Sequence, residues 1–103
     1  MSRIDQLLEL LKQEPDDQFL NYALALEYAK ANEKSKAVLI IENILHQDEN
    51  YLTGYYQLGQ LLEQTGNSDK AKAVYSKGVE IAHKQKNNKT MGELNTALDL
   101  LED

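Results

Sequence analysis

The sequence predicts an all-α protein, an antiparallel solenoid of paired helices, and three observations indicate this fold. Apolar residues recur at spacings of three and four, as at Leu58, Leu61 and Leu62, which is the period of an amphipathic helix. The chain of 103 residues contains one proline, and β-branched residues are sparse. The sequence also repeats itself, because a shift of 34 residues aligns Tyr22 with Tyr56. Together these observations predict about five helices that stack as repeated pairs.

The composition fits one globular domain that covers residues 1–103. Hydrophobic residues make up 42% and charged residues 27%, and no apolar stretch approaches the length of a membrane span. Because cysteine is absent, disulfides and thiolate metal sites are excluded, and we expect a cytoplasmic protein without a cofactor. The net charge of −6 argues against nucleic acid or an anionic membrane as the partner, since phosphate groups require clustered lysine and arginine.

Interruptions of the helical pattern give the order of the elements. They fall near residues 14–17, 31–35, 46–50, 66–69 and 86–90. We therefore expect a first helix over 3–15, a helix pair over 18–51, a second pair over 52–86 and a last helix over 90–102. The second pair has no turn signal between residues 82 and 85, so its last helix is expected to run on to about Lys86.

Residues at matching places in the two pairs predict where helices begin and end. Ser35 and Asp69 each precede Lys-Ala and are expected to be N-caps. Asn32 and Gly66 tolerate the left-handed conformation that ends many helices. The stretch 90–93, Thr-Met-Gly-Glu, is predicted to be a capping box that opens the last helix.

Gly59 lies inside a helical pattern, where glycine costs about 1 kcal/mol relative to alanine. The 34-residue shift places Ala25 at the equivalent position, and it also aligns Ala37 with Ala71. Small residues therefore recur at fixed places in both pairs. We interpret them as the points where the second helix of a pair packs closely on the first.

The period and the small residues resemble the tetratricopeptide repeat family. In the second copy the signature positions are Tyr55, Leu58, Gly59, Leu62, Ala71, Tyr75, Gly78 and His83. In the first copy they are Asn21, Leu24, Ala25, Tyr28, Ala37, Ile41, Ile44 and Glu49, and the match is weakest at Asn21, Ile44, Glu49 and His83. Pro15 matches the terminal proline of a preceding unit, so residues 3–15 resemble its second helix, and the last helix resembles the first helix of a third unit. The resemblance also implies that Tyr28, Tyr55 and Tyr75 are core residues.

A tetratricopeptide repeat fold implies a non-catalytic scaffold or adaptor that binds a protein or peptide. Its concave groove is lined by the first helix of each pair. The residues that the resemblance places there are Phe19, Tyr22, Leu26, Ala29, Lys30, Thr53, Tyr56, Gln60, Glu63, Lys89 and Thr96. The packing signature does not require Phe19, Tyr22, Leu26 or Tyr56, so these four predict apolar anchors for a partner. Alternatively, the N-terminal half unit covers Phe19 and Tyr22.

Some family members hold the acidic C-terminal tails of chaperones with a clamp of Lys, Asn, Asn, Lys and Arg. The corresponding residues here are Tyr22, Leu26, Gln57, Lys89 and Glu93. Only Lys89 matches the clamp, and Glu93 places a negative charge where the clamp has a positively charged arginine. We therefore expect an extended or helical apolar peptide as the ligand, and not a chaperone tail.

A second interpretation is structural, namely a solenoid that forms a homodimer. Repeat arrays usually need about three units and polar caps for stability, and this chain has two full units with truncated ends. Leu7, Leu8 and Leu11 of the first helix, or Leu98 and Leu101 of the last, are candidates for such an interface. The groove itself is another candidate for the homodimer interface.

We expect no catalytic and no metal-binding residue. His46 and His83 lie 37 residues apart, and both lie near predicted helix ends. The acidic pairs 16–17 and 48–49 are interpreted as caps at helix starts. The sequence contains no phosphate-binding glycine loop and no nucleophile elbow.

Overall fold

The computed structural model describes residues 1–102, and this part of the chain forms six α-helices and no strand. The helices are α1 (Arg3–Gln13), α2 (Gln18–Lys30), α3 (Lys34–Gln47), α4 (Leu52–Gln64), α5 (Ser68–Lys84) and α6 (Asn88–Leu101). The all-α class is therefore confirmed. The number is one more than the expected five or so, because the five predicted interruptions separate six helices.

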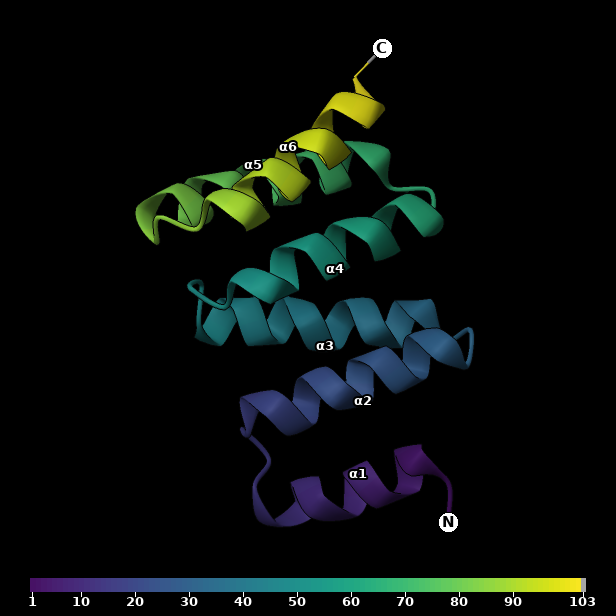
Figure 1. The fold of residues 1–103 in the computed structure, drawn as a ribbon. Helices are drawn as coiled ribbons and strands as arrows, with labels where there is room; N and C mark the ends of the chain where they lie inside the picture. The colour runs from purple at the N-terminus through teal and green to yellow at the C-terminus, as the bar shows by residue number, and fades with distance from the viewer. Residues whose placement is uncertain (103) are drawn as a thin grey trace.

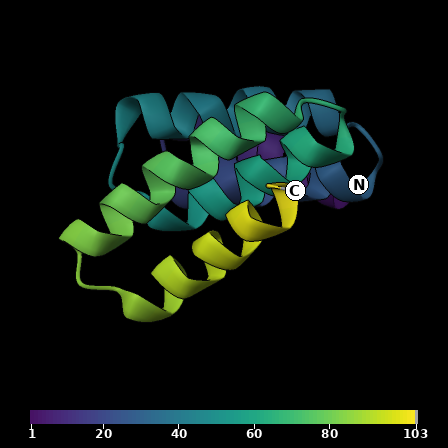
Figure 2. The ribbon, with the colours of Figure 1, turned by 90° about the horizontal axis from the view of Figure 1, so that it is seen from above.

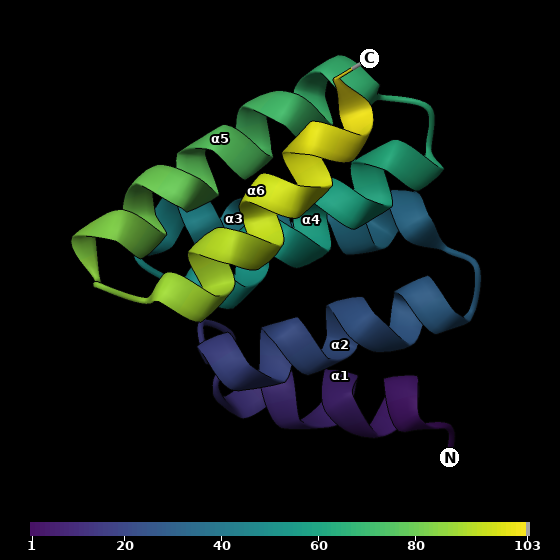
Figure 3. The ribbon, with the colours of Figure 1, turned by 45° about the horizontal axis from the view of Figure 1, so that its top comes forward.

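The helices stack in chain order as antiparallel neighbours (Figure 1). α2 packs on α3 and α4 packs on α5, while α3 against α4 joins the two pairs. The half units lie at the two ends, with α1 against α2 and α6 against α5 (Figure 3). Seen from above, α6 and α3 lie on opposite sides of the stack (Figure 2). The molecule measures 44 × 28 × 19 Å, which is the elongated shape of a solenoid.

Gly59 allows α4 to lie directly against the ring of Tyr75 from α5. A Cβ atom added to Gly59 would overlap the Tyr75 ring, and Tyr75 is completely buried. A reciprocal contact exists at Gly78, where an added Cβ would lie 2.7 Å from the Cβ of Tyr55. The close approach of the two helices inferred from the small residues is therefore confirmed.

The same positions build the core of the first pair, where Ala25, Ala37 and Ile41 are fully buried. Tyr28 differs from Tyr55 and Tyr75 because it is only half-buried, with the Lys36 ammonium 5.2 Å from its ring centroid. Its assignment to the core is therefore correct only in part. The reason is its position between two clusters of buried residues, since it packs at the margin of both.

Three helices end on a residue in the left-handed conformation. Asn32 (φ 62°) follows α2 and Gly66 (φ 83°) follows α4, as the sequence predicts. Lys86 (φ 58°) follows α5, which runs through Lys84 and so includes the expected extension. The backbone of a lysine is more strained in this conformation than that of a glycine or an asparagine.

The predicted helix starts are less accurate than the predicted helix ends. α3 and α5 begin at Lys34 and Ser68, so Ser35 and Asp69 lie inside the first turn and are not N-caps. α6 begins at Asn88, and the side chain of Asn87 accepts a hydrogen bond of 3.1 Å from the Thr90 N–H. The capping box expected at 90–93 is therefore wrong, because an asparagine three residues earlier provides the cap.

The two acidic pairs have different roles. Asp17 caps α2 as predicted, since its carboxylate accepts a 2.8 Å hydrogen bond from the Leu20 N–H. Asp48 caps no helix start, because it follows α3 as the C-cap residue. Its carboxylate instead accepts a 2.9 Å hydrogen bond from Gln18 Nε2 and so connects the start of α2 to the end of α3.

The N-terminal half unit is tied to the stack by its own small core. Leu7 and Leu11 of α1 are buried against Leu24 of α2. Ser2 and Asp5 form a reciprocal capping box at the start of α1. None of the helices formed by residues 1–102 combines the length and the apolarity needed to traverse a lipid bilayer.

Candidate peptide-binding groove

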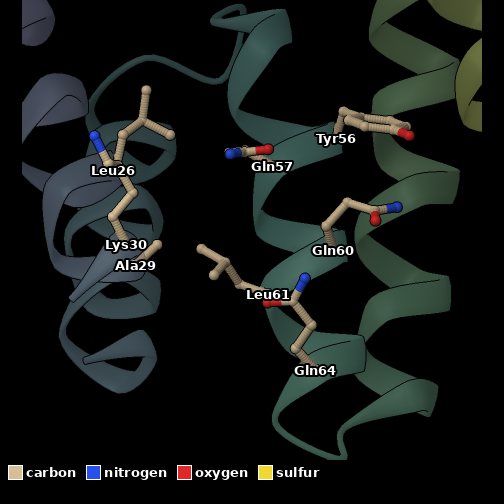
Figure 4. A pocket seen from close by; sticks show the side chains of 8 residues that line it. All are labelled: Leu26, Ala29, Lys30, Tyr56, Gln57, Gln60, Leu61 and Gln64. Carbon is tan, nitrogen blue, oxygen red and sulfur yellow. The ribbon is translucent and has the colours of Figure 1, made fainter. Parts of the chain in front are cut away.

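A cleft of about 520 Å³ lies between α2 and α4, the first helices of the two pairs. In Figure 4 the side chains of Leu26 and Lys30 come from α2, and those of Gln57 and Leu61 face them from α4. The residues that line the cleft are Leu26, Ala29, Lys30, Tyr56, Gln57, Gln60, Leu61 and Gln64. Its floor is apolar and its rim carries three glutamines, and among residues 1–102 Lys30 is the only charged group that lines it.

A second cleft, of about 390 Å³, adjoins the first and extends toward α6. Its lining consists of Tyr22, Leu52, Thr53, Tyr56, Gln57, Gln85, Asn87, Thr90 and Glu93. Tyr56 and Gln57 belong to both clefts. The two clefts therefore form one groove across the first helices of successive units, with Tyr56 at its centre.

The structure brings together seven of the eleven residues that the resemblance places in the groove. Those that line one cleft or both are Tyr22, Leu26, Ala29, Lys30, Thr53, Tyr56 and Gln60. The other four line neither cleft. They are Phe19, which is 72% exposed, Glu63, which is half-buried, and Lys89 and Thr96, which are exposed.

The two N-terminal aromatic residues have different surroundings. α1 leaves Phe19 exposed, so the half unit does not cover it. Tyr22 is half-buried, and its ring meets the edge of Tyr51 at a centroid distance of 5.5 Å. Burial, and to a smaller degree Tyr51, raises the pKa of the Tyr22 hydroxyl above its ordinary value.

Three polar groups form a hydrogen-bonded network behind Tyr56. The Tyr75 hydroxyl donates to Glu63 Oε2 at 2.5 Å and accepts from Gln60 Nε2 at 2.7 Å. Burial, followed by the hydrogen bond to Glu63, raises the pKa of Tyr75 well above its usual range. The Tyr56 ring lies beside this network, 6.3 Å from the Tyr75 ring centroid to centroid.

Several groove residues were not among the sequence candidates. Gln64 stands 34 residues after Lys30 and could have been found by the repeat period alone. Gln57 appeared only as a mismatched clamp position. Leu61 and Thr90 could not be predicted as groove residues from the sequence, because their place in the groove depends on how far neighbouring helices diverge.

The described residues contain no group of three or more His, Asp or Glu side chains placed to hold a metal ion. Every buried side-chain nitrogen or oxygen in residues 1–102 has a hydrogen-bond partner. The two charged residues that line the groove within residues 1–102 lie in different clefts, Lys30 in the larger and Glu93 in the smaller.

The fold and the groove define a helical repeat protein, and comparison with known proteins identifies the repeat. The family model of the tetratricopeptide repeat matches residues 52–85. A tetratricopeptide repeat domain protein from Salinibacter ruber is 35% identical, and its solution structure superposes with a TM-score of 0.81 over 85% of this chain and 89% of that one. The crystal structure of the Salinibacter ruber protein gives a TM-score of 0.78 over 84% of this chain and 96% of that one. The chain belongs to the tetratricopeptide repeat family.

Two further relatives extend the comparison. A protein from Bordetella parapertussis shares the fold, with a TM-score of 0.85 at 23% identity over 98% of this chain and 88% of that one. F-box/TPR repeat protein pof3 of Schizosaccharomyces pombe is 29% identical over 79 residues, which are 76% of this chain. The match spans only 14% of the length of the yeast protein. Proteins of this family are generally non-catalytic scaffolds for protein interactions.

Proposed function

We propose that this protein is a non-catalytic adaptor that holds a protein segment or peptide in the groove centred on Tyr56. The observation that carries the proposal is the continuity of the two clefts, which meet at Tyr56 and Gln57. Tyr56 is 38% exposed although it is large and aromatic. An exposed tyrosine at the centre of a concave surface is the kind of residue that dominates binding energy in protein interfaces.

The chemistry of the groove favours an apolar anchor on the ligand. Leu26, Ala29 and Leu61 form the floor of the larger cleft, and they would bury an aliphatic or aromatic side chain. The glutamines on the rim offer both donors and acceptors to the backbone of a bound peptide. A chaperone tail is not proposed, because a negatively charged terminus would meet Glu93 where the clamp of other family members has arginine.

The test is a selection from a displayed library of random peptides, followed by titration of the synthesised peptides. We expect Tyr56→Ala to weaken their binding at least roughly tenfold, since truncation of a central aromatic residue commonly costs 2 kcal/mol or more. Leu39→Ala is the matched control, because Leu39 is 67% exposed on α3 and lines neither cleft of the groove. Circular dichroism of both variants checks that they keep their helices.

Binding that survives Tyr56→Ala, or that is lost equally in Leu39→Ala, would contradict the proposal. The absence of any selected peptide that depends on Tyr56 would contradict it as well.

We also propose that the protein acts in the cytoplasm, since a chain without cysteine has no need of an oxidising compartment.

A second candidate function is self-association through the ends of the solenoid. The observation in its favour is the exposure of Leu8 and Leu10 on α1 and of Leu100 on α6, which are 41%, 52% and 78% exposed. The observation against it is that Leu7 and Leu11 are buried within the chain, and that Leu98 and Leu101 pack against the core. Most of the leucines that the sequence offered for a homodimer are thus covered by the monomer itself.

A further inference from the structure

The Tyr75 hydroxyl determines how two polar side chains beside the groove are oriented. A carboxylate can only accept, so the single hydroxyl proton must point to Glu63. The oxygen of Tyr75 is then left to accept, so Gln60 must turn its NH2 group toward it. Chemistry alone therefore fixes the Gln60 amide, with its carbonyl oxygen directed away from Tyr75.

This arrangement leaves acceptors without partners. Within residues 1–102, neither Gln60 Oε1 nor Glu63 Oε1 takes part in a side-chain hydrogen bond, and Glu63 is in no ion pair. Gln60 lines the larger cleft, and Glu63 stands one helical turn further along α4. Gln60 therefore presents a carbonyl oxygen at the larger cleft, and Glu63, which lines neither cleft, offers a negatively charged oxygen one helical turn beyond it.

The hydroxyl is not needed for packing. The ring of Tyr75 fills the space above Gly59, and a phenylalanine ring would fill it equally well. The oxygen adds only the bonds to Gln60 and Glu63. A fully buried side chain that holds two surface groups in fixed orientations can act as a positioning residue for a ligand of those groups.

We propose that Tyr75, Gln60 and Glu63 form a subsite for a lysine or arginine side chain that neighbours the apolar anchor of the bound peptide. This inference rests on the proposed function and names the chemistry of the ligand. Ammonium and guanidinium groups are pure donors, so they match two oriented acceptors and neutralise a half-buried carboxylate. The net charge of −6 and Glu93 of the smaller cleft attract a basic segment over a longer range. Lys30, which lines the larger cleft with Gln60, opposes this attraction locally, and Glu27 at 3.9 Å offsets its charge in part.

The experiment uses the same displayed library, selected in parallel on the unmodified protein and on Tyr75→Phe. The strongest peptide is then synthesised with its lysine or arginine intact and with norleucine in that place. We expect the unmodified protein to prefer the charged peptide at least roughly tenfold, as for a charge-assisted hydrogen bond. Tyr75→Phe and Glu63→Gln should each remove most of this preference and retain binding of the norleucine peptide.

Tyr55→Phe is the matched control. Tyr55 is another buried tyrosine, and its hydroxyl donates to the Glu49 carbonyl at 2.6 Å without lining either cleft. Its loss should leave the preference for the charged peptide unchanged. An equal loss in Tyr55→Phe would show that general softening of the helix pair is responsible, and would overturn the assignment to Tyr75.

The remaining outcomes separate the inference from the proposed function. Selected peptides that depend on Tyr56 but show no preference for lysine or arginine would overturn the proposed subsite. They would still support peptide binding in the groove. An undiminished preference in both Tyr75→Phe and Glu63→Gln also overturns the subsite. A selection that yields no Tyr56-dependent peptide overturns both.

Discussion

At the scale of single residues, the missing side chain of Gly59 controls how closely α4 and α5 approach. The ring of Tyr75 occupies the volume that a Cβ would take, and the same ring carries the hydroxyl that orients Gln60 and Glu63. The glycine thus connects core packing to the surface of the groove. Its helix propensity cost of about 1 kcal/mol is offset because a fully buried tyrosine contributes more than that.

We predict that Gly59→Ala lowers the free energy of unfolding by about 1–2 kcal/mol. Overpacking typically destabilises a protein by about 1–3 kcal/mol, and the better helix propensity of alanine offsets up to about 1 kcal/mol of this loss. The matched control is Gly92→Ala in α6, where an added Cβ meets nothing within 4 Å. That substitution should raise stability by up to about 1 kcal/mol, and urea denaturation of both variants measures the contrast. Equal effects of the same sign would refute the role given to Gly59.

At the scale of the helices, the left-handed residues that follow α2, α4 and α5 reverse the chain and bring the next helix back. Asparagine and glycine adopt this conformation at low cost, whereas Lys86 (φ 58°) bears the strain of a side chain with a Cβ. All three ends were expected from the sequence, but a left-handed residue was predicted only at Asn32 and Gly66. The left-handed conformation at Lys86 was not predicted, because lysine is no turn signal.

We predict opposite effects of substitutions at two of these ends. Gly66→Ala should destabilise the protein by about 1 kcal/mol, because φ is 83° there and the space around an added Cβ is open, so that backbone strain alone acts. Lys86→Gly should stabilise it by a few tenths of a kcal/mol, since relief of strain slightly exceeds the extra entropy of the unfolded chain. Thermal unfolding of both variants tests this. A loss of stability in Lys86→Gly would mean that the lysine side chain contributes more than its strain costs.

At the scale of the whole molecule, the half units cap a stack that would otherwise end on open cores. α1 buries Leu7 and Leu11 against Leu24, and α6 buries Leu94 and Ala97 against the rest of the core. Two full repeats with these caps form one elongated body of 44 × 28 × 19 Å. In the proposed function, the groove between the first helices holds the bound peptide.

We predict that the protein is a monomer from low to high micromolar concentration. Sedimentation equilibrium should give a molar mass of 11.7 kDa throughout that range. Leu8→Glu is a useful companion, because it places a charge on the exposed side of α1 and should leave the mass unchanged. A dimer that Leu8→Glu dissociates would instead establish the end of the solenoid as an interface. The candidate groove residues would then have to be tested in the dimer.

The sequence by itself determined the repeat and the contacts that the repeat depends on. Close packing of two helices tolerates only small residues at the crossing, so Gly59, Ala25, Ala37 and Ala71 left a readable pattern at a fixed period. Gly66 and Asn32 were equally readable, because few residues accept a positive φ.

Only the tertiary structure decided where helices begin and which side chains share the groove. Asn87 rather than Thr90 caps α6, since both are acceptable caps and the surrounding packing selects between them. Phe19, Glu63 and Lys89 occupy groove positions by register and yet line neither cleft, whereas Leu61 and Thr90 do. Register fixes the direction of a side chain around its own helix. The distance and angle to the next helix, which set the shape of a groove, result from the packing of the whole core.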